Sequence, residues 1–179
     1  MNKLLLLGFL VLPLAVCAID APVGAPAPPA ESPLAPLTSL VGGLWVGDVP
    51  VPKGAAPLKL ELRFAWTENH RAIHFDSAFV GSKRTPYTSG LYAWDGAKGK
   101  LVIFYVDGGG DLTEGVITPE GSDTLVNELL VTEPTGKTYP VRVRLTKVGT
   151  EVFNNAIFLT KDKEWAPFVA VRYVRQKAE

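Results

Sequence analysis

The sequence predicts an all-β protein: a single antiparallel up-and-down β-barrel of about ten strands. From residue 41 onward the chain is a run of short, alternating apolar segments separated by turn residues, and no helix-length period interrupts the run. No second domain accompanies these segments, so closure into a barrel is the simplest way to leave no strand edge unpaired. The expected strands are Leu44–Val51, Leu58–Trp66, His70–Phe79, Tyr87–Trp94, Lys100–Val106, Asp111–Thr118, Asp123–Thr132, Thr138–Lys147, Glu151–Thr160 and Pro167–Arg175.

The N-terminus has the pattern of an export signal, which we place at residues 1–18. Lys3 gives a short positive start, the run from Leu4 to Val16 is apolar, and Ala18 ends it with a small residue at the expected cleavage point. The apolar run is too short and too interrupted for a comfortable membrane span, which takes about 20 residues. We therefore expect a secreted or periplasmic protein with no transmembrane span in its mature form.

Cys17 is the only cysteine and allows an alternative. Leu14 and Ala15 suit the signal of a bacterial lipoprotein, in which the cysteine accepts a lipid. Val16 does not suit it, because the residue before that cysteine is usually small. If Cys17 instead leaves with the signal, the mature chain has no disulfide, no cysteine zinc site and no thiol nucleophile.

Residues 19–36 are rich in proline and alanine, and we expect them to form a disordered linker. The barrel domain is expected over residues 37–177, with one helical turn at Thr38–Val41 plugging an end of the barrel. The chain has 18 basic and 18 acidic residues and shows no basic stripe, so nucleic acid is not an expected partner.

The connections between the expected strands are short and rich in turn-forming residues. Asp95–Gly99, Asp107–Gly110 and Glu133–Gly136 are examples. Glycine supplies positive φ and proline presets φ, which suits hairpin turns, and connections this short require neighbouring strands to be antiparallel. The longer segment Gly81–Pro86 is expected to be a loop at the mouth of the barrel.

The alternation along the strands predicts a largely apolar interior. In Leu58–Trp66 every second residue is apolar, while Lys59, Glu61 and Arg63 share the other face. His70–Phe79 is more mixed, because His74 and Asp76 fall on one face and could form an inward polar pair. The favoured alternative is that His70 lies in a turn and that His74 is hydrogen-bonded or exposed. Such an interior suits a small apolar or amphipathic ligand. It equally suits a barrel that is filled by its own side chains.

Several short motifs resemble those of a known family. Leu40–Gly47 resembles the Gly-x-Trp opening of lipocalin-like barrels, and four further motifs fit the same pattern: Ser89–Gly96, Val106–Gly108, Glu114–Gly115 and Val171–Arg175. Together, over about residues 37–175, they resemble the bacterial family "domain of unknown function 1579" and its lipocalin-like relatives. The resemblance implies a lipocalin-like barrel and no particular activity. It also implies that Arg175 stacks over Trp45 and closes one end of the barrel.

Haem barrels of the nitrobindin type share this ten-stranded outline and hold the iron through a histidine near the C-terminal strand. Here the segment Trp165–Arg175 contains no histidine. The key axial ligand is therefore missing, and we expect no cofactor.

No motif indicates catalysis or metal binding. His70 and His74 are four residues apart on a strand, which separates them by about 13 Å, too far for one metal ion. Asp107–Asp111 has the glycine content of a hairpin turn and lacks the ligand spacing of an EF-hand. The acidic residues Asp48, Asp76, Glu61 and Glu114 cannot be paired for glycoside chemistry from sequence alone. We therefore assign no catalytic and no metal-binding residue.

Three functional hypotheses remain. The preferred one is an extracytoplasmic module that binds a small apolar or amphipathic molecule inside the barrel. The second is a structural or interaction domain with a filled barrel that acts through its surface. The third is a barrel enzyme that uses an inward group such as His74. The residues expected to contact a ligand are Trp45, Phe64, Trp66, His74, Tyr92 and Trp94, although sequence does not determine which of them face inward.

Overall fold

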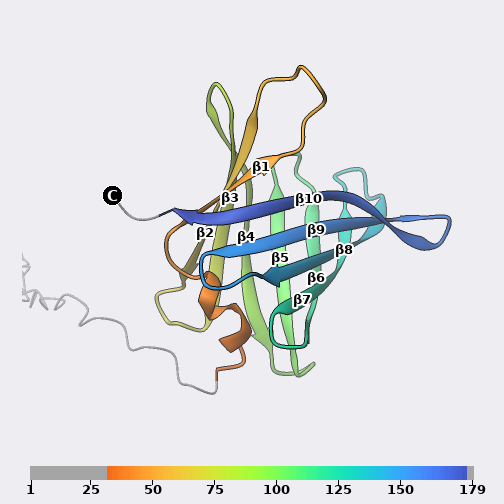
Figure 1. The fold of residues 1–179 in the computed structure, drawn as a ribbon. Helices are drawn as coiled ribbons and strands as arrows, with labels where there is room; N and C mark the ends of the chain where they lie inside the picture. The colour runs from red at the N-terminus through yellow and green to blue at the C-terminus, as the bar shows by residue number, and fades with distance from the viewer. Residues whose placement is uncertain (1–31, 177–179) are drawn as a thin grey trace, which may run out of the picture.

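Ten antiparallel strands form a closed barrel, which confirms the predicted fold class (Figure 1). The structure is a computed structural model that describes residues 32–176. Each strand pairs with its neighbours in the chain, and β1 pairs with β10 to close the barrel. The strands are β1 (Leu44–Val49), β2 (Leu58–Trp66), β3 (Ala72–Val80), β4 (Arg84–Asp95), β5 (Lys100–Asp107), β6 (Leu112–Glu120), β7 (Thr124–Thr132), β8 (Thr138–Lys147), β9 (Val152–Lys161) and β10 (Glu164–Gln176).

The segment Gly81–Pro86, expected to be a loop, is half strand, because β4 begins at Arg84. Strand β3 pairs with β4 as far as Val80 opposite Arg84, and the register shifts between Ser77 and Ala78. Pro86 lies opposite Ala78, next to this irregularity, where a residue without an N–H group is tolerated in a sheet. The connection at the mouth is therefore a tight turn at the end of a long hairpin.

A short 3-10 helix, η1 (Ala35–Leu40), covers one end of the barrel (Figure 1). Leu34, Leu37 and Leu40 are 1–3% exposed and belong to the barrel core. The folded domain thus includes Leu34–Pro36, which we had expected to be linker, because these apolar side chains are needed to fill that end. The predicted signal peptide, Cys17 and the rest of the linker up to residue 31 lie outside the described residues.

Trp45 and Arg175 join the helix to the barrel. The Trp45 Nε1 donates a hydrogen bond of 2.8 Å to the carbonyl of Leu40. The Arg175 guanidinium carbon lies 4.4 Å from the centre of the Trp45 ring, which is the stacking that the family resemblance implied. The same guanidinium donates to three backbone carbonyls at the end of η1 and just after it, those of Ser39, Val41 and Gly42.

Aromatic packing continues from this closed end into the barrel. Phe153 meets the edge of Trp45 at a ring-centre distance of 4.9 Å and stacks on Tyr173 at 4.7 Å. Trp45, Phe153 and Tyr173 are each at most 2% exposed. The helix end of the interior is therefore filled by the chain's own side chains. Among residues 32–176, no helix has the length and apolar character needed to cross a membrane.

Arg175→Met should lower the free energy of unfolding by about 2–4 kcal/mol, because charge-assisted hydrogen bonds and a cation–π contact are lost together. Denaturant titration of both proteins would measure the difference. Arg172→Met is the matched control on the same strand: Arg172 is exposed, and its replacement should change stability by less than about 0.5 kcal/mol. Equal effects of the two substitutions would contradict the assigned role of Arg175.

Candidate ligand-binding cavity

The barrel interior contains a cavity of about 570 Å³. Its lining includes residues of the β5–β6 and β7–β8 turns, Asp107, Asp111, Glu133 and Lys137. Strands alternate in direction from β1, which starts beside η1, so both turns lie at the end opposite the helix. The cavity is therefore closed at the helix end and reaches the turns at the other end, which we call the mouth. A volume of this size is in the range of small-molecule sites.

The cavity wall is mainly apolar and aromatic. Phe75 lies at its centre, with ring-centre distances of 4.9 Å to Tyr92 and 5.8 Å to Tyr105, and Phe64 packs 6.2 Å from Tyr92. Leucine, isoleucine and valine side chains of β2, β5, β7, β8 and β9 complete the wall. Such a surface gains free energy when an apolar molecule displaces water from it.

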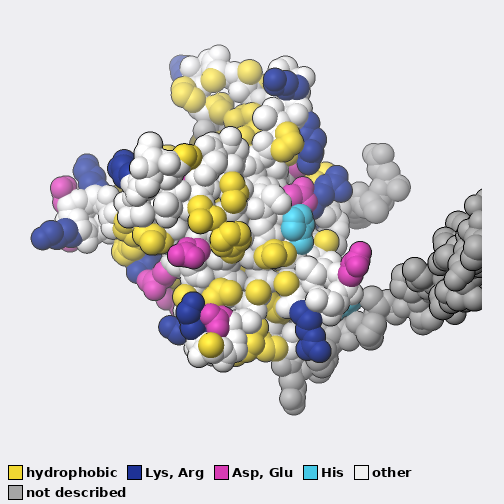
Figure 2. Space-filling view, turned by 180° about the vertical axis from the view of Figure 1, so that it is seen from behind, with side chains coloured by type: hydrophobic (Ala, Val, Ile, Leu, Met, Phe, Trp, Pro, Cys, Tyr) yellow, Lys and Arg dark blue, Asp and Glu magenta, His cyan; other side chains and the backbone are white. Residues whose placement is uncertain are grey.

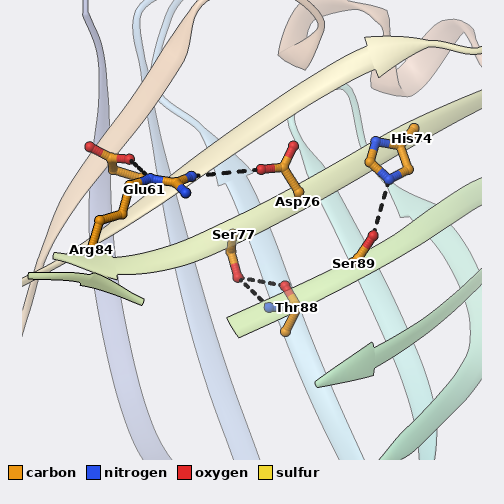
Figure 3. A network of polar contacts seen from close by, with 7 residues as sticks. All are labelled: Glu61, His74, Asp76, Ser77, Arg84, Thr88 and Ser89. Carbon is orange, nitrogen blue, oxygen red and sulfur yellow. Dashed lines mark hydrogen bonds and ion pairs between the residues drawn. The ribbon is translucent and has the colours of Figure 1, made fainter. Parts of the chain in front are cut away.

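A few polar groups interrupt this wall. The hydroxyls of Ser77 and Thr88 are 2.5 Å apart and satisfy each other (Figure 3). Asn127 is 5% exposed, and its Oδ1 has no hydrogen-bond partner among the described residues; the same holds for the buried Oδ1 of Asn155. Both asparagines line the cavity. An unpaired buried polar atom is costly, so each of these oxygens carries a desolvation cost in the folded protein.

At the mouth, two tyrosines flank two carboxylates. We call Tyr87, Asp107, Asp111 and Tyr139 the rim cluster, and all four line the cavity. Asp107 Oδ1 accepts hydrogen bonds from the backbone N–H groups of Gly109 and Asp111, which fixes the β5–β6 turn. This confirms the hairpin turn expected there.

The tyrosines of the cavity hold their protons strongly. Burial raises the pKa of Tyr92, Tyr105 and Tyr173 above the ordinary tyrosine value. Desolvation also raises the pKa of Tyr87 and Tyr139, and the negative charges of Asp107 and Asp111 raise both further. The two phenol groups at the mouth therefore stay neutral beside the carboxylates of Asp107 and Asp111.

The structure brings only part of the predicted ligand-contact set together. Phe64 and Tyr92 line the cavity. Trp45 lies in the closed end, Trp66 stacks on His70 at 5.7 Å, and Trp94 is 44% exposed; none of these three tryptophans lines the cavity. All three lie at or near strand ends on the closed side, away from the hollow part of the barrel. Trp45 packs beside η1, Trp66 packs on a turn residue, and Trp94 is exposed to solvent.

Of the two alternatives for His74, an inward pair with Asp76 is wrong, and a hydrogen-bonded side chain on the outside is what the structure shows. Strand residues alternate between faces, and Phe75 and Ser77 take the inward positions, so His74 and Asp76 point outward (Figure 3). The His74 Nε2 lies 3.1 Å from Ser89 Oγ on the exposed surface. Asp76 lies 3.9 Å from an Arg84 nitrogen, and Glu61 lies 3.0 Å from the same guanidinium. Within residues 32–176, no group of three or more potential metal-ligating side chains converges.

Sequence reasoning missed Asn127, Tyr105 and the rim cluster. A signal for Asn127 was present, because it shares a face with Leu125, Leu129 and Val131 in a strictly alternating strand. Tyr105 likewise follows Leu101 and Ile103 on the inward face of β5. The rim cluster had no comparable signal, because its residues come from three connections far apart in the chain.

Stability should fall as the pH rises above about 10, because tyrosines of the unfolded chain lose their protons there while buried ones do not. Below that pH the buried tyrosines contribute no pH dependence. Tyr92→Phe should make the decline of the unfolding free energy with pH shallower, by up to about 1.4 kcal/mol per pH unit. Denaturant titrations from pH 8 to 11 would measure it. An unchanged slope in Tyr92→Phe would contradict the burial of that phenol.

Comparison with known proteins identifies the fold of the chain but no family. No family model and no curated protein matches the chain. Among solved structures, it is similar to the crystal structure of Rv2717c from M. tuberculosis, with a TM-score of 0.57 and 15% sequence identity over 81% of this chain and 98% of that one. At this identity the likeness shows a shared barrel fold.

Proposed function

We propose that this protein binds a small apolar or amphipathic molecule inside its barrel, outside the cytoplasm. The main support for this proposal is the cavity of about 570 Å³, which is lined by apolar and aromatic side chains and reaches the mouth. The extracytoplasmic location rests on the sequence pattern of residues 1–18.

We also propose that the protein is a lipocalin-like member of the "domain of unknown function 1579" family. The stacking of Arg175 on Trp45 supports this assignment, because the Gly-x-Trp resemblance implied that contact. The third hypothesis, an enzyme using His74, is not carried forward, since His74 faces outward and the condition of convergent groups in a pocket is not met there.

The second candidate function is an interaction domain that uses its outer surface. Leu91, Phe104, Val106 and Leu130 are 39–49% exposed, and Leu91 and Phe104 are paired across β4 and β5. Figure 2 shows hydrophobic side chains gathered on one outer face of the barrel. Exposed apolar side chains that cluster in this way often mark protein contacts. The interior cavity gives the binding hypothesis the stronger support.

Native mass spectrometry of the protein purified from its own compartment without organic solvent tests the preferred function. A reproducible extra mass that is lost on denaturation is the expected result. A bare mass, together with no binding of apolar fluorescent dyes, would overturn the proposal and favour the filled barrel of the second candidate.

A cavity-filling pair of variants provides a second test. Val143→Phe projects into the cavity, so it should leave stability within about 1 kcal/mol of the wild type and weaken dye binding at least about ten-fold. Val171→Phe is the control: Val171 is buried but does not line the cavity, and its Cγ1 would lie 2.4 Å from a β-carbon placed on Gly47. It should therefore destabilise by about 1–3 kcal/mol.

Equal destabilisation by the two substitutions, measured by denaturant titration, would show that the interior around Val143 is already filled. In that case the binding proposal fails even if the dye binds elsewhere on the surface.

A further inference from the structure

The charges that line the cavity are unevenly distributed. All of them lie at the mouth, and they comprise the carboxylates of Asp107, Asp111 and Glu133 and one ammonium group, that of Lys137. Deeper in the cavity the lining is apolar or neutral and polar. A carboxylate buried there would meet no compensating cation among the lining residues, and desolvating an unpaired charge is strongly unfavourable. An anionic group would also be repelled at the mouth.

The single lining cation is already paired. Lys137 Nζ lies 3.4 Å from Glu133 Oε1 and 5.9 Å from the centre of the Tyr139 ring. It thus neutralises Glu133 and leaves the carboxylates of the neighbouring turn, Asp107 and Asp111, without a lysine or arginine partner among the described residues. The same contact shows that an ammonium group is accommodated at this rim by a carboxylate and a tyrosine ring together.

The two mouth turns touch, so the rim cluster is a defined local surface. A β-carbon placed on Gly110 would lie 3.4 Å from Pro134 Cγ, and one on Gly108 would lie 3.7 Å from Tyr87 Cδ2. Tyr87 therefore packs against the turn that carries Asp107 and Asp111, and the β7–β8 turn abuts it. Carboxylates flanked by aromatic rings form the arrangement that binds ammonium groups by combined ionic and cation–π attraction.

Other cations near the mouth do not alter this assignment. Six further cations lie at the same end, in the turns or at the strand ends beside them, and none of them lines the cavity: Lys53, Lys59, Lys83, Arg84, Lys161 and Lys163. Long basic side chains at exposed turns and strand ends keep their charge in water and are screened within about 10 Å at ordinary salt concentration. The groups that a ligand entering the cavity would meet are those of the rim cluster.

The buried amide of Asn127 shows how far below the rim the polar part of the lining extends. Asn127 lies five residues along β7 from the end of the strand at Thr132, which is about 17 Å by the rise of a β-strand. Its unpartnered Oδ1 therefore lies well below the rim. A headgroup held at the rim therefore lies too far away to donate a hydrogen bond to this oxygen, and the choice of headgroup depends on the rim cluster alone.

We propose that the cavity selects amphiphiles with a positively charged headgroup, held at the mouth by Asp107 and Asp111 between Tyr87 and Tyr139, over those with a carboxylate headgroup. The inference rests on the proposed function and names the chemical class of its ligand. The apolar chain enters the barrel, and the ammonium group stays at the rim, where it remains partly hydrated.

The test compares three ligands that differ only in the headgroup. Decylamine, decanol and decanoate are titrated at pH 7, below their micelle concentrations, as competitors of a fluorescent dye bound to the domain. Decylamine should bind at least about ten-fold more tightly than decanoate, with decanol between them. Asp111→Asn should reduce the ratio of amine to carboxylate affinity at least about three-fold, because it removes one rim charge.

Glu68→Gln is the matched control. Glu68 is exposed in the β2–β3 turn at the closed end, so the substitution removes the same charge far from the mouth. It should leave the amine-to-carboxylate ratio unchanged. Decanoate binding as tightly as decylamine, or an equal change in the ratio for Glu68→Gln and Asp111→Asn, would overturn the inference.

The outcomes also separate this inference from the proposed function. If decanol competes and the headgroup makes no difference, only the charge selection fails. If none of the three ligands displaces the dye, and Val143→Phe does not weaken dye binding, the binding function fails as well.

Discussion

The packing of helix η1 against Trp45 and Arg175 determines where the barrel is filled and where it is hollow. A barrel of ten strands encloses more space than an eight-stranded one, whose own side chains can just fill it. Here Leu34, Leu37 and Leu40 enter one end, and the guanidinium of Arg175 binds the carbonyls that follow the helix. The unfilled volume therefore collects at the other end, beneath the hairpin turns.

The same asymmetry separates two kinds of aromatic residue. Trp45, Phe153 and Tyr173 pack tightly against each other at the closed end and stabilise the fold. Phe75, Tyr92 and Tyr105 belong to the cavity wall. The polar interruptions of the wall follow the same division, because Asn127 lies in the hollow part and has no partner for its oxygen. Phe153 and Tyr173 also line the cavity, so they contribute to both packing and binding, whereas Trp45 contributes to packing alone.

Much of the fold could be predicted from sequence because local signals agreed. The apolar alternation of Leu58–Trp66 and Thr138–Lys147 matches β2 and β8 to the residue, and the glycine-rich turns fix their antiparallel order. The start of helix η1 was harder to predict, because Leu34 and Leu37 occur in a proline-rich stretch whose composition resembles that of a linker. Only the space left inside the barrel shows why those leucines are buried.

The candidate site was much less predictable. The alternation of apolar and polar residues divides a strand into two faces, but it does not show which face is inward. His74 and Phe75 are neighbours in β3, yet His74 points outward and Phe75 points into the cavity. Trp45, Trp66 and Trp94 were reasonable choices for ligand contact by residue type, yet their positions near the closed side keep them out of the cavity. The rim cluster depends on how separate turns meet in space, which no local pattern encodes.

The closed end has a consequence for how the domain is presented. Helix η1 opens the described chain at that end, and β10 finishes there too, with Gln176 paired to Leu44 at the start of β1 (Figure 1). The first and the last described segments of the chain therefore both lie at the closed end, away from the mouth. If the domain were immobilised or fused at Leu34 or Gln176, the mouth of the cavity would face away from the point of attachment and stay open to small molecules in solution.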